Sequence, residues 1–111
     1  MAKNFIIGSD TFGRGDSELG ARLMGSFLRT LAAAPDAPSA ILFYNTGVRL
    51  VADGSPVIDA LEALEGRGVD LAACGTCLAH FGLQEHLAVG RESNMQEIVS
   101  IMLGPDETVT V

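Results

Sequence analysis

Residues 40–44 form the apolar run Ala40-Ile41-Leu42-Phe43-Tyr44, which lies between Pro38 and the polar segment 45–47. An unbroken apolar run of this length is typical of a strand that is buried on both faces. Both faces of a strand are buried when helices cover the sheet on each side. The run therefore predicts a central strand in an α/β domain.

Helical and strand patterns alternate on both sides of this run. Apolar side chains at spacings of three and four predict amphipathic helices, and short β-rich runs predict strands. The order βαβαβαβαβ predicts a three-layer α/β/α sandwich with a mainly parallel five-stranded sheet, in a single domain over residues 1–111. The predicted helices span 17–34, 56–66, 78–82 and 94–103, and the other predicted strands span 5–8, 69–73, 86–90 and 108–111.

Composition excludes several classes of function. The chain has 111 residues, 48% of them hydrophobic, and its net charge is −7 from 14 acidic and 7 basic side chains. A strongly acidic chain does not suit nucleic acid or an anionic membrane surface as a partner. No apolar run approaches the length of about 18 residues that a membrane span needs. The amino-terminal residues carry no pattern of a secretory signal. We therefore expect a cytoplasmic protein.

The loops that follow the predicted strands carry the unusual residues. In an open parallel sheet, ligands bind beyond the carboxyl ends of the strands. The loops there are small, polar or glycine-bearing, and three of the four contain an arginine, whereas the loops at the opposite edge look like plain connectors. The sequence therefore predicts a site at the carboxyl edge. Its candidate substrate-binding residues are Arg14, Asn45, Arg49, Thr76 and Arg91.

Two cysteines, Cys74 and Cys77, are the sharpest feature of that edge. Between a strand end and a helix start, Cys77 would lie near unpaired N–H groups and the positive end of a helix dipole, which lowers the pKa of a thiol. Such a thiolate can attack sulfur or hold a persulfide. The structural alternative is that both are small buried residues at a tight turn.

Metal and nucleotide sites are weaker interpretations. Cys74, Cys77, His80 and His86 have a spacing that could suit zinc, but the apolar residues between them look like a packed helix. The segment 9–16 matches neither a dinucleotide-binding nor a P-loop pattern. We therefore expect no metal and no cofactor.

Four segments taken together resemble a known family. Residues 9–20, 43–48, 74–78 and 89–95 are similar, in order and spacing, to the DsrE/DsrF-like (YchN-like) superfamily. Within it they most resemble the carboxyl-terminal domain of YedF proteins, which are linked to selenium metabolism or sulfur transfer. The resemblance implies a homotrimer or homohexamer that relays sulfur as a cysteine persulfide. It places the carrier cysteine at Cys77 and an auxiliary thiol at Cys74.

The resemblance also raises the question of a partner. YedF proteins usually carry an amino-terminal SirA/TusA-like domain that this chain lacks, so a separate SirA/TusA-like sulfur carrier is the expected protein partner. Two other interpretations stay open. One is a non-catalytic oligomeric scaffold or small-anion binding module of the same fold. The other, a thioredoxin-like dithiol oxidoreductase, is disfavoured because the aromatic and proline neighbours of that site are missing.

Overall fold

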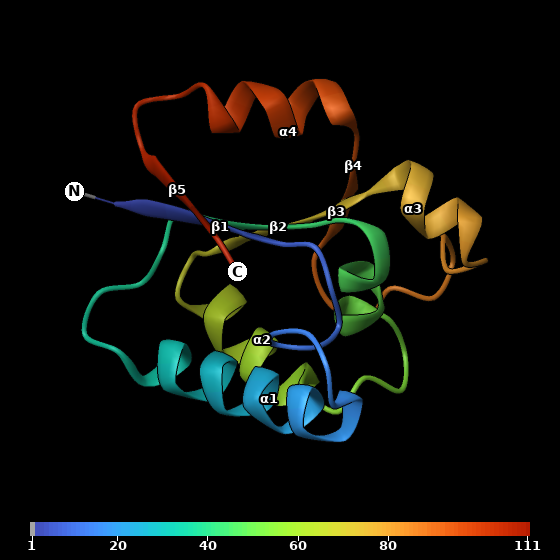
Figure 1. Ribbon diagram of the computed structural model, residues 1–111. Helices are drawn as coiled ribbons and strands as arrows, with labels where there is room; N and C mark the ends of the chain where they lie inside the picture. The colour runs from blue at the N-terminus through green and yellow to red at the C-terminus, as the bar shows by residue number, and fades with distance from the viewer. Residues whose placement is uncertain (1) are drawn as a thin grey trace.

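Five parallel strands form one sheet in the order β4-β3-β2-β1-β5 (Figure 1). The computed structural model describes residues 2–111. Neighbouring strands are in register around the middle of the sheet, where Ile6 of β1 pairs with Leu42 of β2 and Leu42 with Ala72 of β3. The strands are β1 (Lys3–Ile7), β2 (Ala40–Phe43), β3 (Asp70–Cys74), β4 (Arg91–Ser93) and β5 (Glu107–Thr110).

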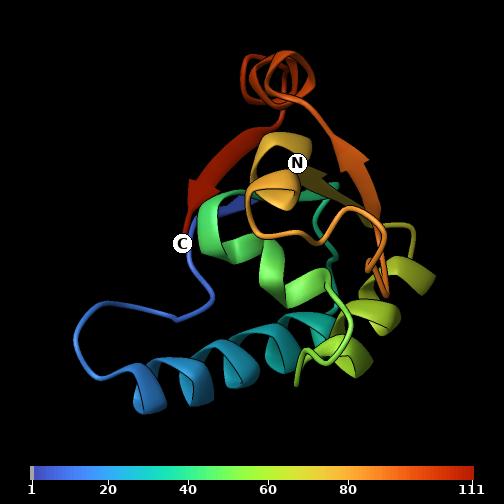
Figure 2. The same cartoon turned by 90° about the vertical axis from the view of Figure 1, so that its right-hand side faces the viewer.

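Helices cover the two faces of the sheet unequally. α1 (Ser17–Ala33) and α2 (Ile58–Gly66) lie on one face, and α4 (Met95–Met102) lies alone on the other (Figures 1 and 2). The 3₁₀ helix η1 (Asn45–Val51) and the short helix α3 (Gly75–His80) sit at the end toward which the strands run. The predicted three-layer sandwich is confirmed, with all five strands parallel.

Burial follows from these layers. All four residues of β2 are buried, as the run at 40–44 predicted. On the α1 and α2 face, Ile41 and Phe43 pack with apolar side chains of both helices, whereas on the other face Leu42 packs with Ile98 of α4. Each large apolar side chain removed from water stabilises the fold by about 2 kcal/mol. The larger core therefore lies under α1 and α2.

The predicted strand at 86–90 is wrong, and β4 begins at Arg91 instead. Ala88 and Val89 donate their N–H groups to the carbonyl of Val51, so this segment packs against η1 rather than β3. Gly90 then turns the chain with a φ of 74° beside the carbonyl of Leu71, a place where a side chain would collide.

Other boundaries differ by a few residues. The segment 45–49, expected as a loop, is the beginning of η1, and α3 starts at Gly75 rather than 78. α2 begins at 58 rather than 56, and the amino-terminal cap of α4 is Asn94, whose side chain accepts from the N–H of Glu97. None of the helices in the described part of the chain is long and apolar enough to cross a membrane.

Candidate functional site

Cys77 lies where three elements meet at the carboxyl edge of the sheet. It is the third residue of α3, which follows β3 directly. Its half-buried side chain faces the start of η1, and the backbone N–H of Asn45 donates a hydrogen bond to Sγ with an N–S distance of 3.1 Å. The thiol therefore accepts a hydrogen bond from a backbone donor at the first residue of η1.

An unusual backbone conformation aims this donor. Asn45 has a φ of 51°, in the left-handed region that asparagine tolerates better than most residues. Its Oδ1 accepts the N–H of Thr46 at 2.8 Å, which ties the side chain into the first turn of η1. Asn45, predicted as a substrate-binding residue, thus reaches the thiol through its main chain.

Cys74 is buried just before the helix that carries Cys77. It is the last residue of β3, it is 1% exposed, and it packs with Ile98 and Leu42 in the core under α4. Both cysteines are free thiols. One turn of backbone separates them, so Cys77 is the accessible member of the pair and Cys74 the enclosed one.

The pKa of the Cys77 thiol is raised above its ordinary value, contrary to the expectation from sequence. Burial is the largest cause, and the neighbouring thiol of Cys74 acts in the same direction. The N–H of Asn45 opposes the rise but does not outweigh it.

The raised pKa predicts the pH profile of alkylation. Only the thiolate reacts, so the labelling rate of Cys77 should climb about tenfold per pH unit through neutral pH and still rise above pH 9. Labelling in urea should level off at a lower pH, because the unfolded thiol is hydrated. Pulsed alkylation read by peptide mass checks this, with Cys77 labelled before Cys74. A plateau below pH 8 in the folded protein would contradict it.

The side chain of Arg91 is held away from Cys77 by its ion pairs. Arg91 lies in β4 beside Ala72 and contacts Asp70 at 2.8 Å and Glu97 at 2.7 Å. Asp70 is the first residue of β3, at the opposite end of that strand from the cysteines. Arg91 thus pairs with Asp70 and Glu97 near the start of β3, because β4 starts later than the sequence suggested.

Arg91 instead supports the fold. Asp70, and then Glu97, hold its pKa above its ordinary value, and Arg91 and Ser93 hold the pKa of Glu97 below its own. We expect Arg91→Ala to lower the Tm by a few degrees and to leave the alkylation profile of Cys77 unchanged. The difference in stability should be present above the ordinary pKa of a glutamate and should vanish as the pH falls through the lowered one. Thermal melts at several pH values measure it, and Arg22→Ala is a solvent-exposed control. A shift in the pH profile of Cys77 alkylation would contradict this and would show that Arg91 acts on the thiol.

The remaining predicted residues, Arg49, Arg14 and Thr76, make no hydrogen bond with the thiol among residues 2–111. The Arg49 guanidinium lies 4.5 Å from the centre of the Phe81 ring and 3.7 Å from the carboxylate of Asp10. Arg14 is exposed in the loop before α1, and no ion pair holds it among residues 2–111. Thr76 is exposed between the two cysteines.

Sequence reasoning missed two neighbours of the site. Phe81 follows α3 and forms one wall of a hollow of about 370 Å³ with Arg49 and Ser55. Tyr44 packs its ring on Gly8, so the residue before Asn45 is held against the end of β1. The polar end of the run at 40–44 was the one available signal for Tyr44. No signal pointed to Phe81, because only the fold brings it under Arg49.

The zinc interpretation finds no geometry in the structure. Among residues 2–111, no three His, Cys, Asp or Glu side chains gather as metal ligands would. His80 packs edge-on against Phe81, and His86 lies 3.6 Å from Asp53. The two histidines are thus engaged elsewhere than at the cysteines.

Solved structures of other proteins share this fold. Three solved structures are similar over nearly the whole length of both chains. A protein of unknown function, MTH1491 from Methanobacterium thermoautotrophicum, is 23% identical with a TM-score of 0.72 and covers 99% of this chain and 98% of its own. The ychN protein of E. coli is 19% identical with a TM-score of 0.68 and full coverage of both chains. BT1422 from Bacteroides thetaiotaomicron, also of unknown function, is 12% identical with a TM-score of 0.65 and covers 98% and 95%.

A comparison with curated protein sequences gave no significant match. The model of the DsrE/DsrF-like family matches residues 10–110, a range that includes both cysteines. Since that match covers most of the chain, the protein belongs to the DsrE/DsrF-like family.

Proposed function

We propose that this protein relays sulfur as a persulfide on Cys77, with Cys74 as an auxiliary thiol. The observation that carries the proposal is the contact of the Cys77 thiol with the N–H of Asn45, one turn from a second free thiol. Family membership supports it, because the resemblance of the sequence to that family implies a sulfur-carrying cysteine at the position of Cys77.

Uptake is a thiol exchange with a donor persulfide. The Cys77 thiolate attacks the outer sulfur of a donor R–S–SH, forms the new S–S bond of Cys77–S–SH, and releases R–S⁻. Delivery to an acceptor thiolate reverses these bonds and returns the Cys77 thiolate. The N–H of Asn45 stabilises the anion of Cys77 in both directions, because a charged acceptor strengthens the hydrogen bond.

Cys74 allows a second reaction of the Cys77 persulfide. Its thiolate can attack Sγ of the Cys77 persulfide, which forms the Cys74–Cys77 disulfide and releases HS⁻. The two thiols lose two electrons and the sulfane sulfur gains them, so the step needs no other oxidant. Because Cys74 is enclosed, this discharge is slow unless β3 and α3 separate locally, and the persulfide can persist for delivery.

The role of Asn45 predicts a matched pair of variants. Asn45→Val disfavours the left-handed φ and turns the N–H away from Sγ, so alkylation of Cys77 at neutral pH should slow about tenfold. Asn45→Gly keeps both the conformation and the N–H and should stay within about twofold of the parent. Pulsed alkylation with peptide mass measures both. Equal rates in the two variants would show that the contact does not support the thiolate.

Mass spectrometry of the intact wild-type chain tests the proposal. After incubation with a low-molecular-weight polysulfide, we expect a gain of about 32 Da on Cys77, reversed by dithiothreitol. A loss of about 2 Da with no gain at any time would instead indicate a dithiol oxidoreductase. An unchanged mass would favour a scaffold or small-anion module, for which the hollow beside Arg49 and Phe81 would be the binding place.

The finer parts of the proposal follow the resemblance. They are a closeness to the YedF carboxyl-terminal domain, a link to selenium metabolism, a cytoplasmic location, a homotrimeric or homohexameric assembly, and a SirA/TusA-like carrier as donor or acceptor. Incubation with the persulfidated carrier, followed by mass spectrometry of both proteins, would test the last of these directly.

A further inference from the structure

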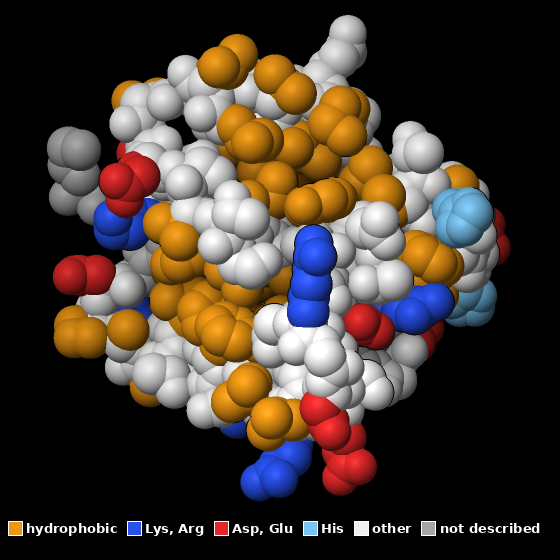
Figure 3. All heavy atoms as spheres, in the orientation of Figure 1, with side chains coloured by type: hydrophobic (Ala, Val, Ile, Leu, Met, Phe, Trp, Pro, Cys, Tyr) orange, Lys and Arg blue, Asp and Glu red, His pale blue; other side chains and the backbone are white. Residues whose placement is uncertain are grey.

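Figure 3 shows apolar side chains gathered in two areas on the face of the molecule where β5 forms the edge of the sheet. The upper area lies on one flank of α4 and continues just past its end. Ile98 faces the sheet, and Glu97 and Ser100 lie on the other flank. The exposed apolar side chains of this flank are Met95 (58%), Val99 (43%), Met102 (44%) and Leu103 (81%).

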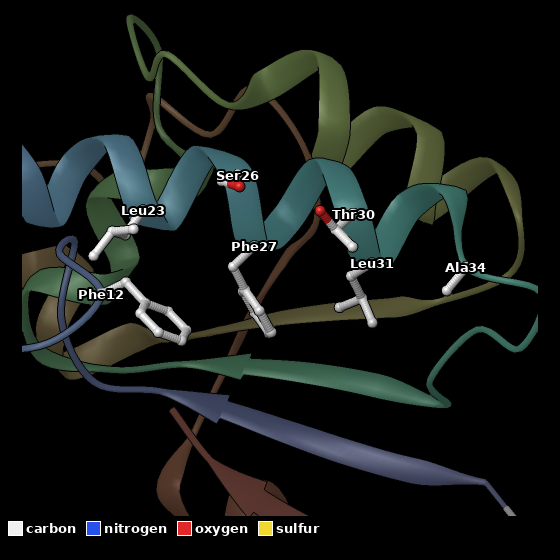
Figure 4. Close-up of a pocket in the computed structure, with 7 residues that line it drawn as sticks. All are labelled: Phe12, Leu23, Ser26, Phe27, Thr30, Leu31 and Ala34. Atoms are coloured by element: carbon white, nitrogen blue, oxygen red, sulfur yellow. The ribbon is translucent and has the colours of Figure 1, made fainter.

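The lower area is a groove of about 400 Å³ along α1. Figure 4 shows Phe12, Leu23, Phe27 and Leu31 along its length, pointing from α1 and the preceding loop toward the sheet. The Phe27 ring lies 5.8 Å from that of Phe5, which is in register with Val109 of β5. The groove therefore reaches the side of β5 opposite to α4.

Between the two areas, β5 has an unpaired edge. The N–H of Val111 donates to the carbonyl of Ile6, so the peptide groups of alternate residues point to β1. Those of Thr108 and Thr110 point the other way, to the open side. Edge strands are usually blunted by lysine, proline or a bulge. β5 reads Glu107-Thr108-Val109-Thr110 and carries none of these.

We propose that β5 pairs antiparallel with β5 of a second copy of this chain, across a two-fold axis perpendicular to the sheet. Such an axis keeps each layer of the two copies on the same side of one continuous sheet. The apolar flank of α4 then faces the same flank of the other copy, and the two α1 grooves also face each other. Both contacts join apolar surface to apolar surface.

The size of the exposed surface fits this occupant. At roughly 150 Å² for a whole side chain, the exposed parts of the four side chains on and just past α4, together with those of Phe12 and Leu23, give about 450 Å² on each copy. Two copies would bury about 900 Å², and the paired strand edges raise this above the roughly 1,000 Å² of a specific interface.

Charge favours this face over the rest of the surface. Two chains of net charge −7 repel each other, so a stable contact has to exclude acidic groups. The six apolar side chains provide such a face, and the acidic Glu107 at the start of β5 is neutralised by Lys3. Added salt should therefore strengthen the pairing, because it screens the remaining repulsion.

The proposal is independent of the sulfur chemistry. A two-fold contact gives a dimer, or a hexamer if a separate three-fold contact is also present. A homotrimer without two-fold contacts would contradict it. The thiol site lies at the carboxyl edge of the sheet, so variants on β5 and α4 can remove the pairing while the persulfide test still reports on Cys77.

The first experiment removes the outward N–H of Thr110. Proline is tolerated at an edge position whose N–H is unpaired, so Thr110→Pro should keep the fold, whereas Thr110→Ala keeps the N–H and serves as the matched control. Sedimentation equilibrium should give at least a dimer for the wild type and for Thr110→Ala. For Thr110→Pro, the dissociation constant of the pairing across the two-fold axis should be about tenfold to a hundredfold higher. The far-UV circular dichroism of this variant should be unchanged.

The second experiment places a charge on α4. Met102→Lys should weaken the same pairing, and Ser100→Lys, on the other flank, should not. Amide exchange provides a readout that does not depend on a variant, because the N–H of Thr110 should be protected only at concentrations where the wild type pairs. A wild type that stays at 11.6 kDa up to high concentration, or an assembly unaffected by both Thr110→Pro and Met102→Lys, would overturn the proposal.

Discussion

Cys77→Ser is expected to abolish the uptake of sulfur from a polysulfide completely, so that no gain of about 32 Da remains in the intact mass. A serine hydroxyl occupies nearly the same space and can still accept the N–H of Asn45, so the fold should be preserved. It cannot attack a sulfane sulfur at neutral pH, because the thiolate is the nucleophile in this exchange. The measurement is the mass spectrum at several times after mixing.

Cys74→Ser is the matched comparison. This variant keeps the accessible thiol and removes the one that can form the internal disulfide, so the persulfide on Cys77 should form at a similar rate and last longer. Because a hydroxyl in the core under α4 costs stability, a melt should accompany the measurement. Sulfur uptake by Cys77→Ser, or its loss in a folded Cys74→Ser, would reverse the roles assigned to the two cysteines.

Gly47→Ala is expected to destabilise the protein by about 3 kcal/mol, which corresponds to a fall in Tm of roughly 10–15 °C. Gly47 is buried in η1, and a Cβ there would come closer than 3.0 Å to the backbone carbonyl of Ile7 at the end of β1. A backbone carbonyl cannot rotate away as a side chain can. The strand end or η1 has to shift, and Asn45 in the same turn shifts with it.

Gly66→Ala provides the control for this substitution. Gly66 is the last residue of α2, and an added Cβ meets nothing within 4 Å. Alanine favours the helix, so this variant should melt at the parent temperature or slightly above it. Chemical denaturation would give the free energies of unfolding of both variants, provided that the dependence of this free energy on denaturant concentration is the same in each. A Gly47→Ala protein as stable as the parent would show that the end of β1 and η1 can separate enough to admit a methyl group.

The sequence predicted the layers because its signals are local. Residues 40–43 are buried on both faces, as the composition of the apolar run predicted. Asp16 caps α1 by accepting the N–H of Leu19, as an aspartate before a helix should. β4 could not be found in this way. It has only three residues, two of them exposed, and its place beside β3 depends on the packing of Leu87 and Val89 against η1 and the core.

Cys77 lies at the edge of the sheet that the sequence predicted, but the pKa of its thiol does not follow the expectation. The position of Cys77 followed from its place after a strand, which is local information. The raised pKa depends on burial and on Cys74, and the true surroundings of Arg91 depend on a strand register. The pKa of Cys77 and the ion pairs of Arg91 both depend on residues that are distant in sequence. The spacing of residues along the chain therefore does not reveal them.

The pairing of β1 with β5 has a consequence for how the chain folds. The Lys3–Glu107 pair joins residues 104 positions apart, so the strand that enters the sheet first in sequence gains its second neighbour only from the far end of the domain. Closing so long a loop is entropically costly, and contacts of this separation slow folding. Until β5 arrives, the apolar edge of β1 is open to other chains. Refolding at low protein concentration should therefore return more native protein than refolding at high concentration.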